Sequence, residues 1–267
     1  MADVETILRD GDIEILGRVP HASNATLVCE ARLGDGEPVR CVYKPIRGEA
    51  PLWDFPDGTL ADREVASYEI SQALGWGLIP ETVLRVEAPL GPGMVQRWID
   101  LPDDEPDVDV VDLVPVDAVP PGVKVILRAY DAADRPVVLV HQSADRLRQL
   151  AVLDVIINNA DRKGGHILRT DDGRLYGIDH GICLHADDKL RTVLWGWAGE
   201  QIPATLLADV ERLAARLRDV GDPLRAQLAA HLTAVELDAL AARCAVLAAG
   251  AIMPVPPPHR PIPWPPF

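Results

Sequence analysis

Two carboxylates in the second half of the chain have the spacing and the neighbours of a phosphate-handling site. Asp161 opens the segment Asp161-Arg162-Lys163 after an apolar run, and Asp179 follows a short apolar run and opens an Asp-x-Gly turn. A predicted β-hairpin formed by 166–169 and 175–178 brings both carboxylates to one rim. Phosphoryl transfer uses this arrangement, in which one carboxylate orients the acceptor hydroxyl and another holds Mg²⁺ on the phosphates.

A lysine and a glutamate in the first half complete this chemistry. The chain has only four lysines against 22 arginines, so the position of each lysine is informative. Lys44 ends a predicted strand, where it can neutralise the charge of α- and β-phosphates. Glu64, on the next predicted helix, can hold that lysine in place. Either Arg162 or Lys163 can stabilise the charge that develops on a transferred group.

Hydrophobic periodicity predicts the elements that carry these residues. In the first half, short strands at 13–16, 26–32 and 39–43 form a meander that ends at Lys44. A helix over 60–74 begins at Asp57 or Thr59 as its cap, and strands follow at 82–87 and 93–99.

The second half has a different character. Residues 100–117 hold eight acids and no base, which indicates an exposed loop or linker. It is followed by a strand pair at 123–130 and 136–141, a helix over 144–158 capped by Ser143, and helices between 198 and 247.

The last 14 residues contain eight prolines and are predicted to be extended. They are either disordered, a strap packed on the body through Trp264 and Phe267, or a ligand for a polyproline-binding partner.

Five short motifs in order resemble the atypical kinases of the phosphatidylinositol 3-/4-kinase superfamily. The resemblance is nearest to the type II phosphatidylinositol 4-kinases and bacterial proteins with that domain, and more distant to HipA-type toxin kinases. It covers roughly residues 13 to 200. The matching motifs are Asn159 to His166, Ile178-Asp179-His180-Gly181, Glu64 with Tyr68, Leu74-Gly75 with Ile79-Pro80-Glu81-Thr82, and Trp195-Gly196-Trp197.

The resemblance implies a two-lobed, protein-kinase-like α+β fold. Its expected divisions are a β-rich N-lobe (1–99), an acidic linker with a strand (100–136), a helical C-lobe (137–250) and a Pro-rich tail (251–267). It also implies an ATP-dependent kinase that uses Mg²⁺ or Mn²⁺ and phosphorylates a hydroxyl of a soluble small molecule or a protein.

The same resemblance assigns roles to residues. Asp161, Arg162 and Lys163 are the expected catalytic residues, and Asp179 and His166 are the expected metal ligands. The expected nucleotide-binding residues are Lys44, Glu64, Ser23 in the phosphate-covering loop, and Met94, Gln96 and Trp98 in a hinge that faces adenine.

His166 departs from the family pattern, which has Asn at that position. An imidazole favours manganese over magnesium in comparison with an amide oxygen, so either His166 binds the metal with a changed preference or it lines the site as a proton carrier. Histidine in place of Asn also leaves open the alternative that the protein is a pseudokinase, which binds nucleotide without transferring phosphate. A third alternative keeps the fold but transfers AMP instead of phosphate. A zinc or iron site made by His166, His180, His185 and Asp179 is a further alternative, although it gives Lys44 no role.

Composition excludes several classes of function. The net charge of −15 and the 4% aromatic content argue against nucleic-acid partners and against stable anchoring on anionic lipid. No stretch approaches 18 apolar residues, and the N-terminal sequence lacks the features of a signal peptide. Four cysteines without C-x-x-C spacing are expected to be reduced and buried. A cytoplasmic, bacterial protein is the expectation.

Overall fold

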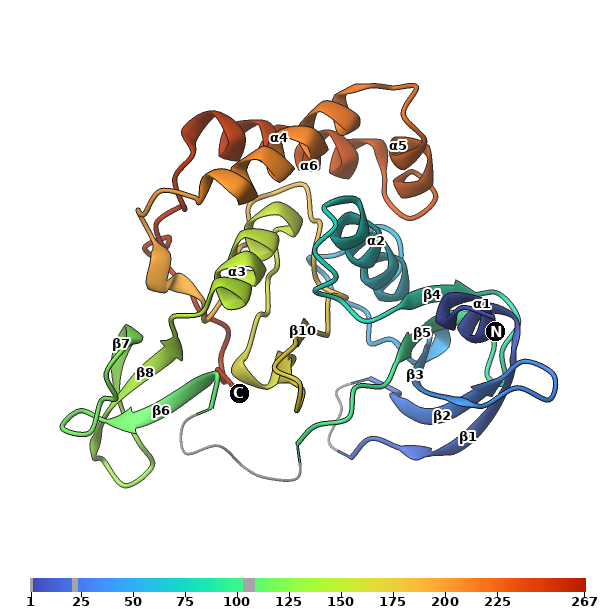
Figure 1. Ribbon diagram of the computed structural model, residues 1–267, viewed down its shortest axis with the longest axis horizontal. Coiled ribbons are helices and arrows are strands. Elements are labelled where there is room, and N and C mark those ends of the chain that lie inside the picture. The colour runs from blue at the N-terminus through green and yellow to red at the C-terminus, as the bar shows by residue number, and fades with distance from the viewer. Residues whose placement is uncertain (1, 21–23, 103–108) are drawn as a thin grey trace.

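The fold is described from a computed structural model, which covers residues 2–20, 24–102 and 109–267 (Figure 1). Its first half contains α1 (Val4–Asp10), β1 (Asp12–Arg18), β2 (Leu27–Arg32), β3 (Val39–Pro45), α2 (Leu60–Ala73), β4 (Thr82–Arg85) and β5 (Gly93–Arg97). Its second half contains β6 (Val111–Pro115), β7 (Val123–Tyr130), β8 (Pro136–Gln142), α3 (Asp145–Ile157), β9 (Ile167–Arg169), β10 (Leu175–Gly177), α4 (Ala204–Arg218), α5 (Pro223–Leu228) and α6 (Ala234–Gly250). The predicted α+β class is confirmed.

The first sheet places Lys44 at the end of a central strand. Its order is β1-β2-β3-β5-β4 with antiparallel neighbours, and Lys44 of β3 lies opposite Met94 of β5. The short helix α1, which the sequence analysis did not predict, buries Leu8 against Cys29 and Cys41 of this sheet. All four cysteines are free and buried, as expected.

Helix α2 lies between this sheet and the helices of the second half (Figure 1). Thr59 is its cap, because the Thr59 side chain accepts a hydrogen bond from the Asp62 backbone N–H. Most of its residues are buried, including the charged side chains Arg63 and Glu64. The helix is therefore enclosed on several sides, which fixes the direction of Glu64.

A second, three-stranded sheet corrects the prediction of an exposed loop over 100–117. Its order is β6-β8-β7, and β6 occupies residues within that acidic segment. Val111 and Val114 of β6 are 2% and 7% exposed, because they pack toward β8. The acids around them obscured the apolar positions. Residues 103–108 of the segment lie outside the described part of the chain.

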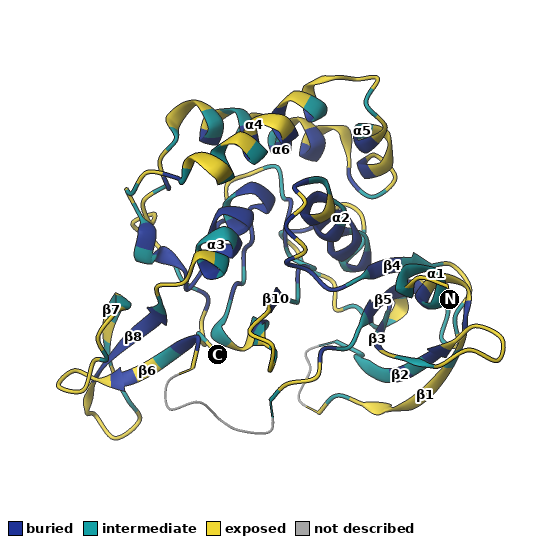
Figure 2. Cartoon of the chain, in the orientation of Figure 1, coloured by how far each residue is buried: buried dark blue, intermediate teal, exposed yellow. Residues whose placement is uncertain are grey.

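Helix α3 forms the centre of the helical half. Its side chains Leu147, Leu150, Leu153 and Ile156 are completely buried, and Figure 2 shows the buried colour over much of the helix, with exposed and intermediate residues in its first turns. The cap is Ala144 rather than the predicted Ser143, and no side chain bonds the first turn. In the described part of the chain, no helix is both long enough and apolar enough to cross a membrane.

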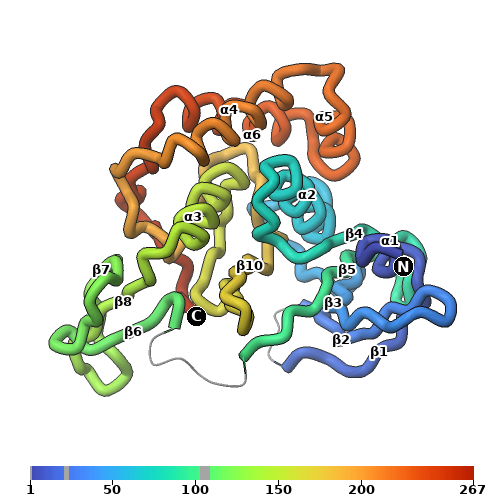
Figure 3. Tube along the Cα trace, viewed as in Figure 1, coloured from blue at the N-terminus to red at the C-terminus, as the bar shows by residue number. Residues whose placement is uncertain are grey.

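The Pro-rich tail runs back over the helical half. Figure 3 shows its path from α6 to a C-terminus close to the β9–β10 hairpin. Met253 is buried, and the carbonyl of Pro261 accepts hydrogen bonds from the Thr192 N–H and the Trp195 indole. The strap alternative is therefore confirmed. Trp264, one of its two expected anchors, is 82% exposed and does not anchor it.

Candidate active site

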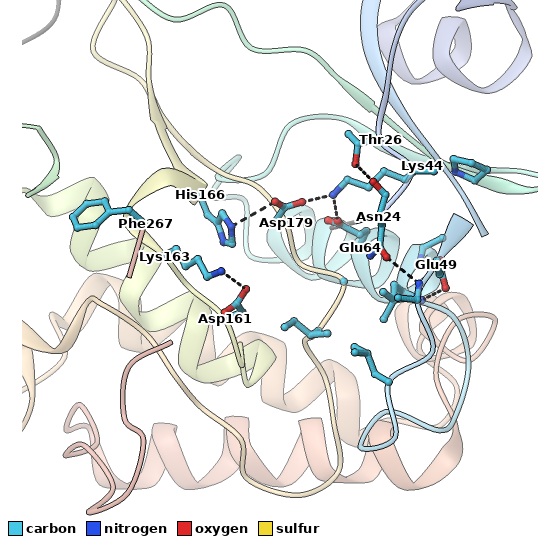
Figure 4. Close-up of a pocket in the computed structure, with 18 residues that line it drawn as sticks. Asn24, Thr26, Lys44, Glu49, Glu64, Asp161, Lys163, His166, Asp179 and Phe267 are labelled. Atoms are coloured by element: carbon cyan, nitrogen blue, oxygen red, sulfur yellow. Dashed lines mark hydrogen bonds and ion pairs between the residues drawn. The ribbon is translucent and has the colours of Figure 1, made fainter. Parts of the chain in front are cut away.

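Lys44 connects the two halves of the molecule through two carboxylates. Its Nζ donates to Glu64 Oε1 at 2.8 Å and is also ion-paired with Asp179 Oδ1 (Figure 4). The Glu64 side chain is 3% exposed, whereas Asp179 is 45% exposed. One carboxylate therefore fixes the lysine and the other stands open to solvent beside it.

Local backbone geometry brings Asp179 to this position. Asp179 follows β10 and has a left-handed φ of 58°, which turns the chain sharply. The N–H of the next residue, His180, donates to Glu64 Oε2 at 2.8 Å. Both oxygens of Glu64 are thus used, one for Lys44 and one for the turn that carries Asp179.

The charges in this group are matched. Burial alone would lower the pKa of Lys44, but the negative charges of Glu64 and Asp179 raise it above its ordinary value. Burial would likewise raise the pKa of Asp179, but Lys44 holds it below its ordinary range. Lys44 is therefore cationic and Asp179 anionic at neutral pH.

Asp161 is positioned by hydrogen bonds within its own loop. Its backbone N–H donates to Asn159 Oδ1 at 2.9 Å, and Asn159 Nδ2 donates to the buried Asp154 at 3.0 Å. Burial raises the pKa of Asp161, while Lys163, with Nζ 3.5 Å from Asp161 Oδ2, acts against that rise. A carboxylate with a raised pKa is a better proton acceptor than an ordinary aspartate.

Arg162 does not face the site, which corrects the prediction that it could meet a transferred group. Its side chain is fully buried and pairs with Asp154 at 3.0 Å. It also donates to the carbonyls of His166 and Ile178 and to His180 Nε2. Because these partners satisfy the guanidinium, Arg162 holds the Asp161 loop and the Asp179 turn together. Of the two candidates, only Lys163 faces the site.

His166 lies beside Asp179, with Nε2 3.5 Å from Asp179 Oδ2. Burial lowers the pKa of His166 to about 4, so the ring is neutral at pH 7 and has a free lone pair. Its buried Nδ1 has no hydrogen-bond partner among the described residues. A carboxylate and a neutral imidazole on one side of an open space fit a divalent cation whose other ligands come from phosphate or water.

The zinc or iron alternative does not fit the geometry. His180 is completely buried and accepts a hydrogen bond from Arg162, and the ring of His185 packs edge-on against Phe55. Within the described ranges, no group of three or more His, Cys, Asp or Glu side chains is arranged to hold a metal ion. His180 and His185 are packing and hydrogen-bonding residues.

The charged side chains line a cavity of about 450 Å³ between the sheet and the helical half (Figure 4). It contains six of the expected site residues: Lys44, Glu64, Asp161, Lys163, His166 and Asp179. It also contains Asn24, next to Ser23 of the predicted phosphate-covering loop, and residues that the sequence analysis missed, among them Thr26, Glu49 and Phe267. Glu49 accepts hydrogen bonds from the first backbone N–H groups of α2, at Leu60 and Ala61. No sequence signal marked these contacts, because they join distant segments.

The other expected nucleotide-binding residues do not line this cavity. Met94 is fully buried between the sheet and α2, and Gln96 donates to the Thr82 hydroxyl inside the sheet. Trp98 packs under the guanidinium of Arg40 at 4.6 Å. These three residues therefore contribute no side chain to the cavity, and their place in a hinge that faces adenine stays a prediction. Ser23 lies outside the described residues.

Comparisons with known proteins give one family model and one close relative in sequence. A family model described as phosphatidylinositol 3- and 4-kinase matches residues 132–221. Protein Rv2133c of Mycobacterium tuberculosis (strain ATCC 25618 / H37Rv) is 51% identical over 271 residues, which is 99% of this chain and 96% of that protein.

Solved structures share the fold at low sequence identity. The crystal structure of the Golgi casein kinase with Mn/ADP bound has a TM-score of 0.54 and 15% identity, over 93% of this chain and 76% of that chain. The structure of hydra Fam20 with sugar has a TM-score of 0.53 and 15% identity, over 93% of this chain and 87% of that chain.

Proposed function

We propose that this chain is an atypical kinase of the phosphatidylinositol 3-/4-kinase type, which transfers the γ-phosphate of ATP to a hydroxyl. The single observation that carries this proposal is the Lys44–Glu64–Asp179 group, which faces Asp161 and Lys163 across one cavity. A cation fixed by a buried carboxylate, beside an open carboxylate and a second acid, meets the needs of phosphoryl transfer.

Each residue has a distinct task in the transfer. Lys44 binds the α- and β-phosphates, and Glu64 keeps it in place. Asp161 accepts the proton of the acceptor hydroxyl while the bond from that oxygen to the γ-phosphorus forms. The bond between the γ-phosphorus and the bridging oxygen breaks, and its electron pair leaves with ADP. Lys163 stabilises charge on the transferred group.

Asp179 and His166 would hold a divalent metal ion, and the Mn/ADP complex of the Golgi casein kinase supports this role. When bound, the ion neutralises phosphate charge. Lys44 is ion-paired with Asp179, so the lysine and the metal ion would share this carboxylate.

The acceptor is proposed to be a soluble small molecule or a protein. The net charge of −15 opposes approach to an anionic lipid surface. A hydroxyl compound that diffuses into the cavity avoids this repulsion.

The test combines nucleotide binding with transfer. A thermal-shift titration with ATP and Mg²⁺ or Mn²⁺ is expected to raise the Tm by about 5 to 10 °C at saturating ligand. Asp179→Ala is expected to abolish metal-dependent stabilisation, while Asp117→Asn, an exposed acid, leaves it unchanged. Absence of stabilisation with every nucleotide would reject the proposal.

A nucleotide-binding protein without transfer activity is the second candidate. It is favoured by His166 at the position where the family has Asn, and by the direct Lys44–Asp179 ion pair. Mass spectrometry after incubation with ATP separates the candidates: an added phosphate indicates kinase activity, and an added AMP indicates adenylyl transfer. Binding without a modified protein or small molecule favours the second candidate.

A further inference from the structure

The tail, residues 251–267, is fixed to the helical half at three successive places. Met253 exchanges backbone hydrogen bonds with Gly199 and Glu200. The Pro261 carbonyl accepts from two N–H groups, and the Pro266 carbonyl accepts from the Gly164 N–H at 2.8 Å. Proline offers a carbonyl but no N–H, so an extended Pro-rich segment is suited to accepting hydrogen bonds from a neighbouring surface.

The last of these contacts is in the loop that carries Asp161. Gly164 lies between Lys163 and Gly165, and the Phe267 ring packs against it. A Cβ at Gly164 would lie 2.6 Å from Cε1 of Phe267, whereas a Cβ at Gly165 would meet nothing within 4 Å. Gly164 is therefore the position in this loop that leaves room for the ring.

Phe267 also faces the cavity. It lines the same space as Asp161, Lys163 and His166, and 46% of the residue remains exposed. Figure 4 shows it beyond His166, on the side away from Lys44. Because almost half of this aromatic residue is exposed, next to three polar groups, part of its apolar surface is available to a ligand.

We propose that Phe267, held by the tail, forms the acceptor-side wall of the cavity and selects a hydroxyl compound with an apolar face beside its hydroxyl. This inference rests on the proposed phosphotransfer, in which Asp161 receives the acceptor. The ring lies on the Asp161 side, and Lys44 holds the phosphates on the other. The ring therefore also limits the access of water, the simplest competing acceptor.

The rate of ATP hydrolysis, in which water is the acceptor, tests whether Phe267 limits the access of water to the cavity. Phe267→Ala is expected to raise the hydrolysis rate about fivefold, because an opened site admits water. Gly164→Ala, which displaces the ring, is expected to act in the same direction. The hydrolysis rate of the double variant should not exceed the rate of Phe267→Ala alone. Gly165→Ala is the matched control in the loop, and Val255→Ala, 69% exposed, is the control in the tail.

A second measurement does not depend on turnover. The chain has only two phenylalanines, Phe55 and Phe267, so labelling with 4-fluorophenylalanine gives two ¹⁹F signals. A non-hydrolysable ATP analogue with Mg²⁺ is expected to shift the Phe267 signal more than the signal of Phe55, which lines an adjoining hollow and not the cavity itself. Phe267→Leu assigns the signals.

The outcomes separate this inference from the proposed function. If the analogue stabilises the unmodified protein but neither moves the Phe267 signal nor gives faster hydrolysis in Phe267→Ala and Gly164→Ala, the wall is rejected and the kinase proposal stands. If no nucleotide stabilises the unmodified protein, the proposed function fails and the acceptor role of Phe267 fails with it.

Discussion

Lys44 depends more strongly on Glu64 than on Asp179, although it contacts both carboxylates. Glu64 is almost completely buried, and a charge pair is stronger where water is excluded. Glu64 also accepts the backbone N–H of His180, so it fixes the turn that carries Asp179. One carboxylate thus positions a cation from the first sheet and a carboxylate from the helical half.

Glu64→Gln tests this dependence. The amide can still accept a hydrogen bond from Lys44 but carries no charge, and losing a charged hydrogen bond costs about 1.5 to 3 kcal/mol. Phosphotransfer is therefore expected to fall roughly ten- to hundredfold. Steady-state kinetics measure the loss, and Glu87→Gln, an exposed residue, is the control. An unchanged rate would show that Lys44 does not need Glu64.

His166→Asn tests the metal preference. The neutral imidazole beside Asp179 favours manganese, and an amide oxygen favours magnesium. The ratio of Mn²⁺-supported to Mg²⁺-supported activity is expected to fall about tenfold. Titration of each metal against phosphotransfer measures this ratio. An unchanged ratio would indicate that His166 is not a ligand.

Residue type and spacing were sufficient to predict that Lys44, Glu64, Asp161 and Asp179 meet at one site, because each lies on or next to a recognisable strand, helix or turn. They were not sufficient for Arg162. Its role depends on Asp154, His180 and two carbonyls that reach it only in the folded chain. Phe267 was assigned to a strap, but nothing in the sequence placed it at the cavity.

Among the helices and strands, α2 links the site to the rest of the fold, because it carries Glu64 and also contacts the C-terminal helices. Arg63 donates to the Cys183 carbonyl at 2.9 Å and pairs with Glu236 of α6 at 2.5 Å. His231, which lies between α5 and α6, contacts two carboxylates of α2: Asp62 through Nδ1 at 2.9 Å and Glu69 through Nε2 at 3.6 Å. These contacts hold the helix at a fixed place relative to the cavity.

The His231 contacts predict a pH dependence of stability. Hydrogen bonds to Asp62 and Glu69 raise the pKa of His231 to about 9, against 6.5 ordinarily. A raised pKa means that the folded state binds the proton more tightly, so the stabilisation is complete below pH 6.5 and is lost as the pH rises through 9. At pH 7 it is on the order of 2 to 3 kcal/mol.

His231→Gln removes the titrating group. Urea denaturation at pH 6, 7.5 and 9.5 is expected to show a stability difference between the two proteins that shrinks with rising pH. A difference that stays constant across this range would mean that His231 is not protonated in the fold.

Elements with a clear apolar pattern were predictable, including the short strands β9 and β10, and two elements without such a pattern were not. The helices over 60–74 and 144–158 and the strands around the cavity were found from periodicity, as α2, α3 and their neighbours show. Helix α1 has seven residues, too few for two periods, and its cap Asp3 lies in an acidic stretch. Strand β6 has two buried valines among acids, and only pairing with β8 reveals it.

At the scale of the whole molecule, the two lobes share α2. Ala61 and Val65 of this helix pack with Met94 of the first sheet. Ala66 and Ile70 of the same helix belong to the large core that includes α3 and α6. The sheet therefore cannot separate from the helical half without exposing an apolar face of α2, so the lobes should unfold together.

The four buried cysteines allow the unfolding of each lobe to be followed separately, which tests whether the two lobes unfold together. Cys29 and Cys41 lie in the first sheet, and Cys183 and Cys244 lie in the helical core. Pulsed alkylation across a urea gradient, with peptides identified by mass spectrometry, is expected to give the same midpoint for both pairs. A chain of 267 residues exceeds the size at which two-state unfolding is usual, so coincidence would reflect the shared helix rather than small size. Reaction of Cys29 and Cys41 at lower urea would show that the lobes are independent, and that Lys44 and Asp179 are brought together only by the contacts across the cavity.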